Sequence, residues 1–184
     1  MRSGTRKTRF LCFVRQFLEH PKQLGTFTQS SRALARRMAQ EIDGSLEVVE
    51  FGAGTGVVTE EILRKLPKNG RLVCFEINPR FCDYLRGLND PRLKVINDDA
   101  RNCEQYVDDL KCVVSGLPLM LFSGRERNEL LATVSKADRY IQLQYFPVLK
   151  GRLKDRFPQV KLRFVPQNLP PAFVCVCSKP ARTQ

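Results

Sequence analysis

Residues 46–63, LEVVEFGAGTGVVTEEIL, combine an apolar run, three glycines at alternate positions and a second apolar pattern. The run before the glycines is rich in β-branched residues, which is typical of a buried strand. After the glycines, Val58, Ile62 and Leu66 recur at helical spacing. Strand, glycine loop and helix form the opening unit of a nucleotide-binding α/β fold, in which glycines let the loop turn tightly and approach a ligand.

Two acids accompany this loop. Glu50 precedes the first glycine, and Glu76 ends the next apolar run at a position suited to binding ribose hydroxyls. ExGxGxG with an acid after the second strand resembles motifs I and II of class I S-adenosylmethionine (SAM) methyltransferases. The alternative is an ordinary βαβ unit with a glycine-rich turn. The resemblance implies a cofactor site made of Glu50, Gly52, Gly54, Thr55, Gly56, Glu76 and Ile77.

Composition indicates one soluble domain over residues 1–184, with a partner that carries negative charge. No apolar run approaches the roughly 20 residues of a membrane span, and no signal-peptide pattern is present, which favours a cytoplasmic protein. The net charge of +12 favours nucleic acid or an anionic membrane surface as partner. The alternative is a basic surface without a specific partner.

The cysteines do not indicate a metal site. Seven are scattered along the chain, and His20 is the only histidine. The odd number and the lack of a framework favour a reducing compartment. Cys175 and Cys177 would share one strand face, but no second pair accompanies them, so we expect no metal.

The N-terminal residues 1–29 predict an amphipathic helix followed by a loop that contains Thr28. Four cations and no acid occupy residues 1–9, and an aromatic stripe follows, formed by Phe10, Phe13 and Phe17. A basic start with such a stripe is typical of a helix at a membrane interface. The same stripe could instead pack on the domain, and both arrangements could alternate as a lid over the acceptor pocket.

Strands and helices alternate along the rest of the chain, which predicts a mostly parallel sheet of seven strands with an antiparallel last strand. After the third strand, either Asp98 or Asp99 could cap a helix beginning near Asn102. In this fold class an acid there meets the adenine amino group, and we assign that role to Asp99, followed by Ala100. The segment after strand four is the expected place for substrate. The predicted strands cover residues 46–51, 71–76, 93–97, 111–115, 140–146, 161–165 and 173–177.

A more specific resemblance extends over residues 10–178. The segments that carry it include Glu76-Ile77-Asn78-Pro79-Arg80-Phe81 and Ser115-Gly116-Leu117-Pro118-Leu119. They resemble the soluble, Rhodobacter-type bacterial phosphatidylethanolamine N-methyltransferases, which have a Rossmann-like fold. The resemblance implies successive methyl transfer from SAM to a phospholipid headgroup, without a metal and with S-adenosylhomocysteine as product. It also implies a cytoplasmic protein bound peripherally to a membrane.

The family is related to rRNA adenine dimethyltransferases, which are the leading alternative. In those enzymes an amide or carboxylate and an aromatic ring follow strand four and hold the flipped base. Here residues 115–119 have neither, and the chain does not continue into a C-terminal helical lobe. We therefore expect nucleic acid to be the less favoured partner.

Methyl transfer from an activated sulfonium depends mainly on positioning of the amine. Tyr145 at the end of strand five is expected to hold the acceptor nitrogen, beside Ser115 and Gly116; otherwise it is a tyrosine at the edge of the core. Candidates for the lipid phosphate are Lys150, Arg152 and Lys154. Because no general base is identifiable, a SAM-binding or membrane-binding protein without activity is a third interpretation.

Overall fold

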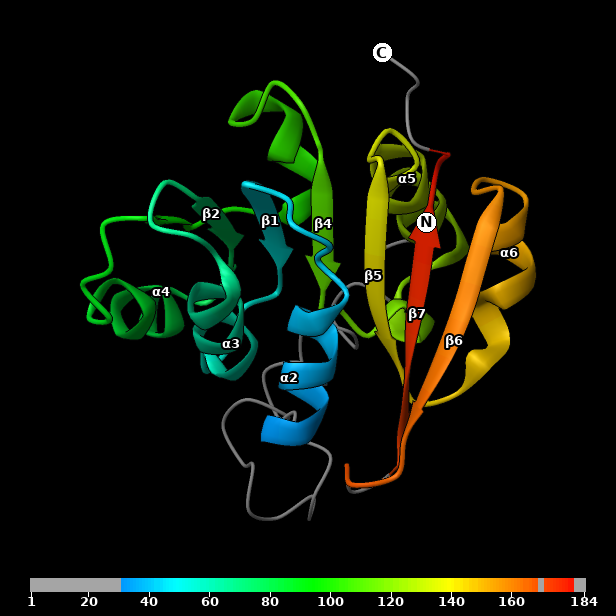
Figure 1. Cartoon of the computed structure of the whole chain (residues 1–184). Coiled ribbons are helices and arrows are strands. Elements are labelled where there is room, and N and C mark those ends of the chain that lie inside the picture. The colour runs from blue at the N-terminus through cyan, green and yellow to red at the C-terminus, as the bar shows by residue number, and fades with distance from the viewer. Residues whose placement is uncertain (1–30, 169–170, 181–184) are drawn as a thin grey trace, which may run out of the picture.

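The computed structural model describes residues 31–168 and 171–180. A twisted sheet of seven strands runs through the domain in the order β3-β2-β1-β4-β5-β7-β6 (Figure 1). Six strands are parallel, and β7 is antiparallel to both of its neighbours. The strands are β1 (Glu47–Phe51), β2 (Arg71–Phe75), β3 (Leu93–Ile96), β4 (Cys112–Ser115), β5 (Arg139–Gln144), β6 (Gln159–Val165) and β7 (Ala172–Ser178).

Helices cover both faces of the sheet. One face carries α2 (Arg32–Gln40), α3 (Val57–Lys65) and α4 (Pro79–Arg86). The other carries the 3-10 helix η1 (Ala100–Gln105), α5 (Gly124–Val134) and α6 (Lys150–Lys154). Two short 3-10 helices, η2 (Leu119–Leu121) and η3 (Pro147–Leu149), follow the ends of β4 and β5.

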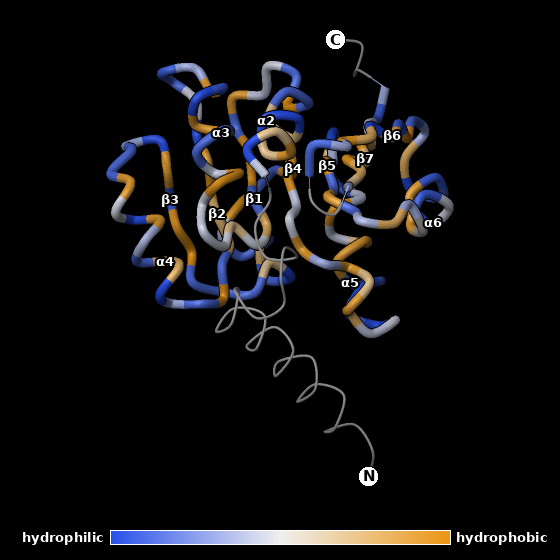
Figure 2. Tube along the Cα trace, turned by 90° about the horizontal axis from the view of Figure 1, so that it is seen from below, coloured by the Kyte–Doolittle hydropathy of each residue, from blue (hydrophilic) through white to orange (hydrophobic). Residues whose placement is uncertain are grey.

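Alternation along the strands builds two apolar layers. On β5, Ile141 and Leu143 belong to the layer under α2 and α3, whereas Tyr140 belongs to the layer under α5. The hydropathy-coloured trace shows strands that are largely apolar and helices in which polar and apolar residues alternate (Figure 2). Because helices cover both faces of the sheet, we expect ligands to bind at the edge formed by the carboxyl ends of the parallel strands.

The structure confirms the predicted sheet, including the antiparallel last strand. The helix α2 begins after Ser31, whose hydroxyl accepts a hydrogen bond from the Leu34 amide at 3.1 Å. The helix expected near Asn102 is the 3-10 helix η1, which begins two residues earlier and is capped by Asp99, whose side chain accepts the Arg101 amide. The predicted N-terminal helix lies outside the described residues.

Candidate active site

The glycine loop joins β1 to α3 at the carboxyl edge of the sheet. Gly52, Gly54 and Gly56 all have positive φ values, of 72°, 54° and 80°. A side chain at Gly52 would lie 2.6 Å from the Leu117 Cδ2 atom, whereas one at Gly54 would meet nothing within 4 Å. The loop therefore packs tightly on the segment after β4 at Gly52 and is open to a ligand at Gly54.

Glu76 fastens this loop to the end of β2. Its Oε2 atom accepts the Gly54 amide at 2.8 Å, and its Oε1 atom accepts the Asn78 amide at 2.9 Å. Each carboxylate oxygen can accept one further hydrogen bond, which leaves capacity for two hydroxyl groups. The next residue, Ile77, exposes about half of its side chain, so an apolar surface adjoins the carboxylate.

Glu50 is buried behind the loop rather than facing it. Its carboxylate accepts hydrogen bonds from the Thr59 hydroxyl at 2.7 Å and from the Cys74 thiol at 3.1 Å. Burial raises the pKa of Glu50 from 4.5 to about 7, although these two hydrogen bonds act in the opposite direction. The structure thus places Glu50 where it connects β1 to α3 and β2, and a direct contact with cofactor stays a prediction.

The raised pKa of Glu50 predicts a stability that depends on pH. Between pH 4.5 and about 7 the folded protein binds more protons than the unfolded chain, so the free energy of unfolding falls as pH rises through this range. Glu50→Gln should remove this dependence on pH. The free energy of unfolding of the variant, relative to wild type, should therefore rise by about 3 kcal/mol from pH 5 to pH 8. Denaturant melts at both pH values, with Glu47→Gln on the exposed start of β1 as control, test this. An equal effect of Glu50→Gln at both pH values would contradict it.

Asp99 and Ala100 lie at the end of β3. Asp99 caps η1, and its two oxygens also accept hydrogen bonds from the Arg101 guanidinium. Burial alone would raise the pKa of Asp99, but the hydrogen bonds from Arg101 outweigh it and hold the pKa below its ordinary value. Ala100 is buried in the layer under α5. For Asp99 to contact an adenine amino group, the Arg101 side chain would have to move.

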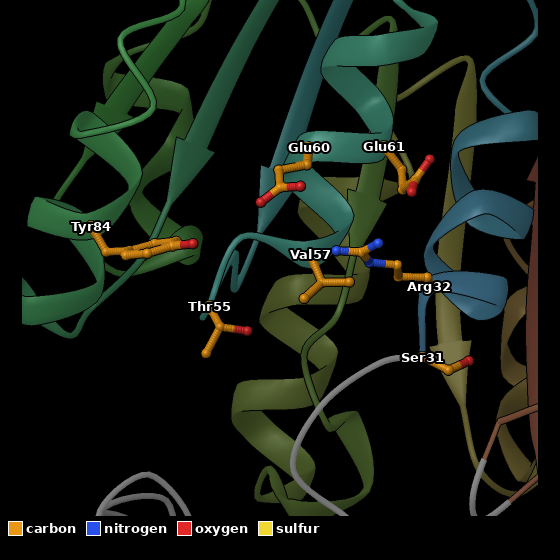
Figure 3. Close-up of a pocket in the computed structure, with 7 residues that line it drawn as sticks. All are labelled: Ser31, Arg32, Thr55, Val57, Glu60, Glu61 and Tyr84. Carbon is orange, nitrogen blue, oxygen red and sulfur yellow. The ribbon is translucent and has the colours of Figure 1, made fainter.

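A cavity of about 460 Å³ lies between α2, the glycine loop and α4. Figure 3 shows the Arg32 side chain reaching from the first turn of α2 to Val57, with Thr55 on the loop and Tyr84 opposite on α4. Thr55 was predicted from the sequence, but Arg32 and Tyr84 were not. The three elements are far apart in sequence, and no local pattern marks residues that converge only after folding.

A polar side chain of β5 forms a hydrogen bond with the segment after β4. The Gln142 Nε2 atom donates to the Leu117 carbonyl at 2.9 Å, and its Oε1 atom accepts the Tyr140 hydroxyl. Ser115 is fully buried, and its hydroxyl accepts the Leu117 amide at 3.3 Å. Gly116 lies so close to the loop that a side chain there would be 3.2 Å from the Gly52 carbonyl oxygen. Ser115 and Gly116 are thus beside the glycine loop. The buried Ser115 hydroxyl fixes the backbone at Leu117 through its hydrogen bond.

Comparison with known proteins identifies the fold. A family model described as a methyltransferase domain matches residues 48–138, which contain the glycine loop, Glu76 and the segment after β4. The seven-stranded sheet, with β7 antiparallel between β5 and β6, is part of a fold that solved methyltransferases share. This is a class I SAM-dependent methyltransferase domain.

Relatives of the methyltransferase domain act on different acceptors. An ornithine lipid N-methyltransferase from Singulisphaera acidiphila is 29% identical over 91% of this chain and 95% of its own. The ribosomal RNA small subunit methyltransferase A of Mesomycoplasma hyopneumoniae is 27% identical over 65% of this chain and 46% of its own, so the chain spans about half of that relative.

Solved structures similar to the methyltransferase domain include a toxoflavin-precursor methyltransferase and an rRNA methyltransferase. The 1,6-didemethyltoxoflavin-N1-methyltransferase of Burkholderia thailandensis superposes with a TM-score of 0.71 at 14% identity, over 97% of this chain and 91% of that one. The 23S rRNA methyltransferase ErmE gives 0.62 at 18% identity, over 82% and 69%. At these identities the likeness concerns the fold.

The cofactor of the methyltransferase domain is SAM. The described residues suit it: Glu76 retains acceptor capacity beside the exposed Ile77, and the open position at Gly54 admits a close ligand. SAM supplies an activated methyl group when bound. Among the described residues, no cluster of His, Cys, Asp or Glu could hold a metal ion.

Tyr145 follows β5 on the side of α2 and packs against that apolar layer. Burial raises the pKa of its hydroxyl, although a hydrogen bond with Asn168 acts in the opposite direction. Asn168 is buried and accepts the Ser31 amide at 2.9 Å. Tyr145 therefore stays protonated at neutral pH and is linked to the start of α2, beside the cavity-lining Arg32.

The other predicted acceptor and membrane residues fall in two groups. Lys150, Arg152 and Lys154 are exposed on α6, which begins directly after η3 at the carboxyl end of β5. Phe10, Phe13, Phe17 and Thr28 lie outside the described residues. None of the described helices has the length and apolar character of a membrane span.

Proposed function

We propose that this methyltransferase acts on the amine of phosphatidylethanolamine, working from the cytoplasm as a peripheral protein at a membrane surface. The observation that carries the proposal is an apolar rim at the carboxyl edge of the sheet, consisting of Met120, Leu121, Phe146 and Phe164. These side chains are 52%, 43%, 61% and 58% exposed, respectively. Met120 and Leu121 follow β4, Phe146 follows β5, and Phe164 is the second-last residue of β6. All four positions are on the same edge of the sheet as the glycine loop.

A rim of large apolar side chains suits a lipid surface. Monomeric soluble proteins seldom gather such residues around a site unless they bind an apolar partner. The cations of α6 lie next to the rim, since α6 follows η3 and Phe146. Apolar contact with acyl chains and cationic contact with phosphates would together hold a basic domain reversibly on an anionic leaflet.

The ornithine lipid N-methyltransferase relative supports the same class of acceptor, an amine on a lipid headgroup. The proposed chemistry needs a deprotonated amine close to the cofactor. Enclosure in an apolar pocket lowers the pKa of an ammonium group, which favours loss of its proton to water. Tyr145 can attract the methylated product by a cation–π contact.

The second candidate is methylation of adenine in RNA. The similarity to ribosomal RNA methyltransferases and the net charge of +12 favour it. Against it, the segment 115–119 offers no amide, carboxylate or aromatic ring to hold a flipped base. The rim would also have no use in binding a phosphate backbone.

The rim predicts which variants lose activity on vesicles. Replacing Met120 and Phe146 together by serine should lower vesicle binding and lipid methylation at least about tenfold, because each buried side chain contributes about 1.5–3 kcal/mol. Rising salt should weaken wild type further, since the cations also take part. Vesicle co-sedimentation and label transfer from SAM measure both effects.

Leu46→Ser is the matched control. Leu46 is also about half exposed, but it precedes β1 and lies at the opposite edge of the sheet. Its loss should leave vesicle binding unchanged. If the double rim variant binds and methylates vesicles as wild type does, or if RNA takes up more label than lipid, the proposal is wrong.

A further inference from the structure

Gln144, the last residue of β5, has a buried side chain without a partner. The residue is 6% exposed, and neither its Nε2 nor its Oε1 atom has a hydrogen-bond partner in the part of the chain that the structure describes. An amide left in this state costs free energy, because it loses its hydrogen bonds to water and gains none. Such a group is expected where a ligand supplies the missing partner.

The register places Gln144 beside the candidate acceptor site. Ser115 at the end of β4 pairs with Gln142, so Gln144 lies two residues closer than Gln142 to the carboxyl edge of the sheet. Side chains on a strand alternate, so Gln144 shares a face with Gln142, whose amide holds the Leu117 carbonyl. The unpartnered amide is therefore next to the segment that packs on Gly52 of the glycine loop.

The neighbouring segment cannot provide an amide of its own. Residues 115–119 are serine, glycine, leucine, proline and leucine. Across the sheet, Gln144 pairs with Phe173 and through it with Phe164 of the rim. An amide standing between the glycine loop and the rim lies where a headgroup amine would meet the cofactor.

We propose that Gln144 positions the acceptor nitrogen by accepting an N–H of the amine through Oε1. This inference rests on the proposed function. During transfer the deprotonated nitrogen forms the N–C bond with its lone pair, the C–S bond breaks, and its electron pair stays on sulfur. The nitrogen becomes cationic, so its hydrogen bond to Oε1 strengthens toward the transition state. The product ammonium then loses a proton to water. Because the amide is enclosed, acceptor binding has to displace neighbouring side chains.

The mechanism depends on how many N–H groups the acceptor has left. A neutral primary amine has two and a monomethylated amine has one, whereas a dimethylated amine has none. Gln144 thus assists the first two transfers and contributes nothing to the third. A residue with only a structural role would affect all three transfers alike.

The test compares Gln144→Met with wild type on vesicles of phosphatidylethanolamine and of its N-methyl and N,N-dimethyl forms. We expect kcat/KM to fall about tenfold on the first two acceptors, the effect of one lost hydrogen bond, and to change less than about twofold on the third. SAM affinity should be unchanged, and Tm should be equal or higher, since methionine removes an unpaired buried amide. Gln159→Met, on an exposed glutamine at the start of β6, is the control.

Equal losses on all three acceptors, no loss on any of them, or a lowered Tm would overturn the role of Gln144. Equal losses on all three acceptors, or a lowered Tm, would indicate that the Gln144 amide stabilises the fold and does not contact the acceptor. If wild type methylates none of the three lipids, the proposed function is wrong and this inference falls with it. Wild-type activity with an unaltered Gln144→Met profile would refute the inference alone.

Discussion

Glu76→Ala is expected to weaken SAM binding by about 1–3 kcal/mol, which is roughly a 5- to 150-fold increase in Kd. The carboxylate is placed to accept ribose hydroxyls, and it also accepts the Gly54 and Asn78 amides. Its removal therefore costs ligand contacts and loosens the glycine loop at the same time. Glu76→Gln should weaken binding as well, because its amide nitrogen would face a backbone N–H group.

Isothermal titration with SAM measures this effect. Asp83→Ala is the control, because Asp83 is an exposed acid on the neighbouring α4 and pairs only at the surface with Arg86. We expect its Kd to match wild type. An unchanged affinity in Glu76→Ala would refute the assignment of the cofactor site.

Substitutions in the glycine loop should separate cofactor binding from acceptor positioning. Gly54→Ala puts a methyl group into the open space above the loop and should raise the Kd for SAM at least about tenfold by obstructing the cofactor. Gly52→Ala points instead at Leu117 and should displace the segment after β4. Both lose about 1–2 kcal/mol of stability, because both positions have positive φ.

The readouts are titration with SAM, kcat for methyl transfer, and denaturant melts. Gly52→Ala should lower kcat more than it raises the Kd for SAM, and Gly54→Ala should do the reverse. Gly124→Ala, in the first turn of α5 with free space around it, should keep wild-type activity and stability. The same balance of effects in both loop variants would contradict the assigned geometry.

Local patterns were enough to predict the cofactor half of the fold. The strand before Gly52, the helix after Gly56 and the acid at Glu76 are close in sequence, and each follows from periodicity or turn chemistry. The acceptor half depends on long-range pairing. The insertion of β7 between β5 and β6, and the pairing of Gln144 with Phe173, follow from strand register rather than from any local sequence pattern.

Some site residues were missed for the same reason. Arg32 on α2 and Tyr84 on α4 line the same cavity from elements that are far apart in sequence, and neither residue has a motif around it. Gln142 and Gln144 did leave a signal, since two amides at alternate positions of an otherwise apolar strand are unusual. Such amides normally have specific hydrogen-bond partners. In the described residues Gln142 has one, the Leu117 carbonyl, whereas the Gln144 side chain has none.

The acceptor proposed for this methyltransferase is a lipid amine. The most direct test is one reaction that contains SAM with a labelled methyl group, phosphatidylethanolamine vesicles with anionic lipid, and RNA at equal acceptor concentration. After extraction, label should be found in the lipid fraction, on N-methylated headgroups identified by mass spectrometry. Label found predominantly in RNA, on adenine, would show that the acceptor is RNA and not a lipid amine.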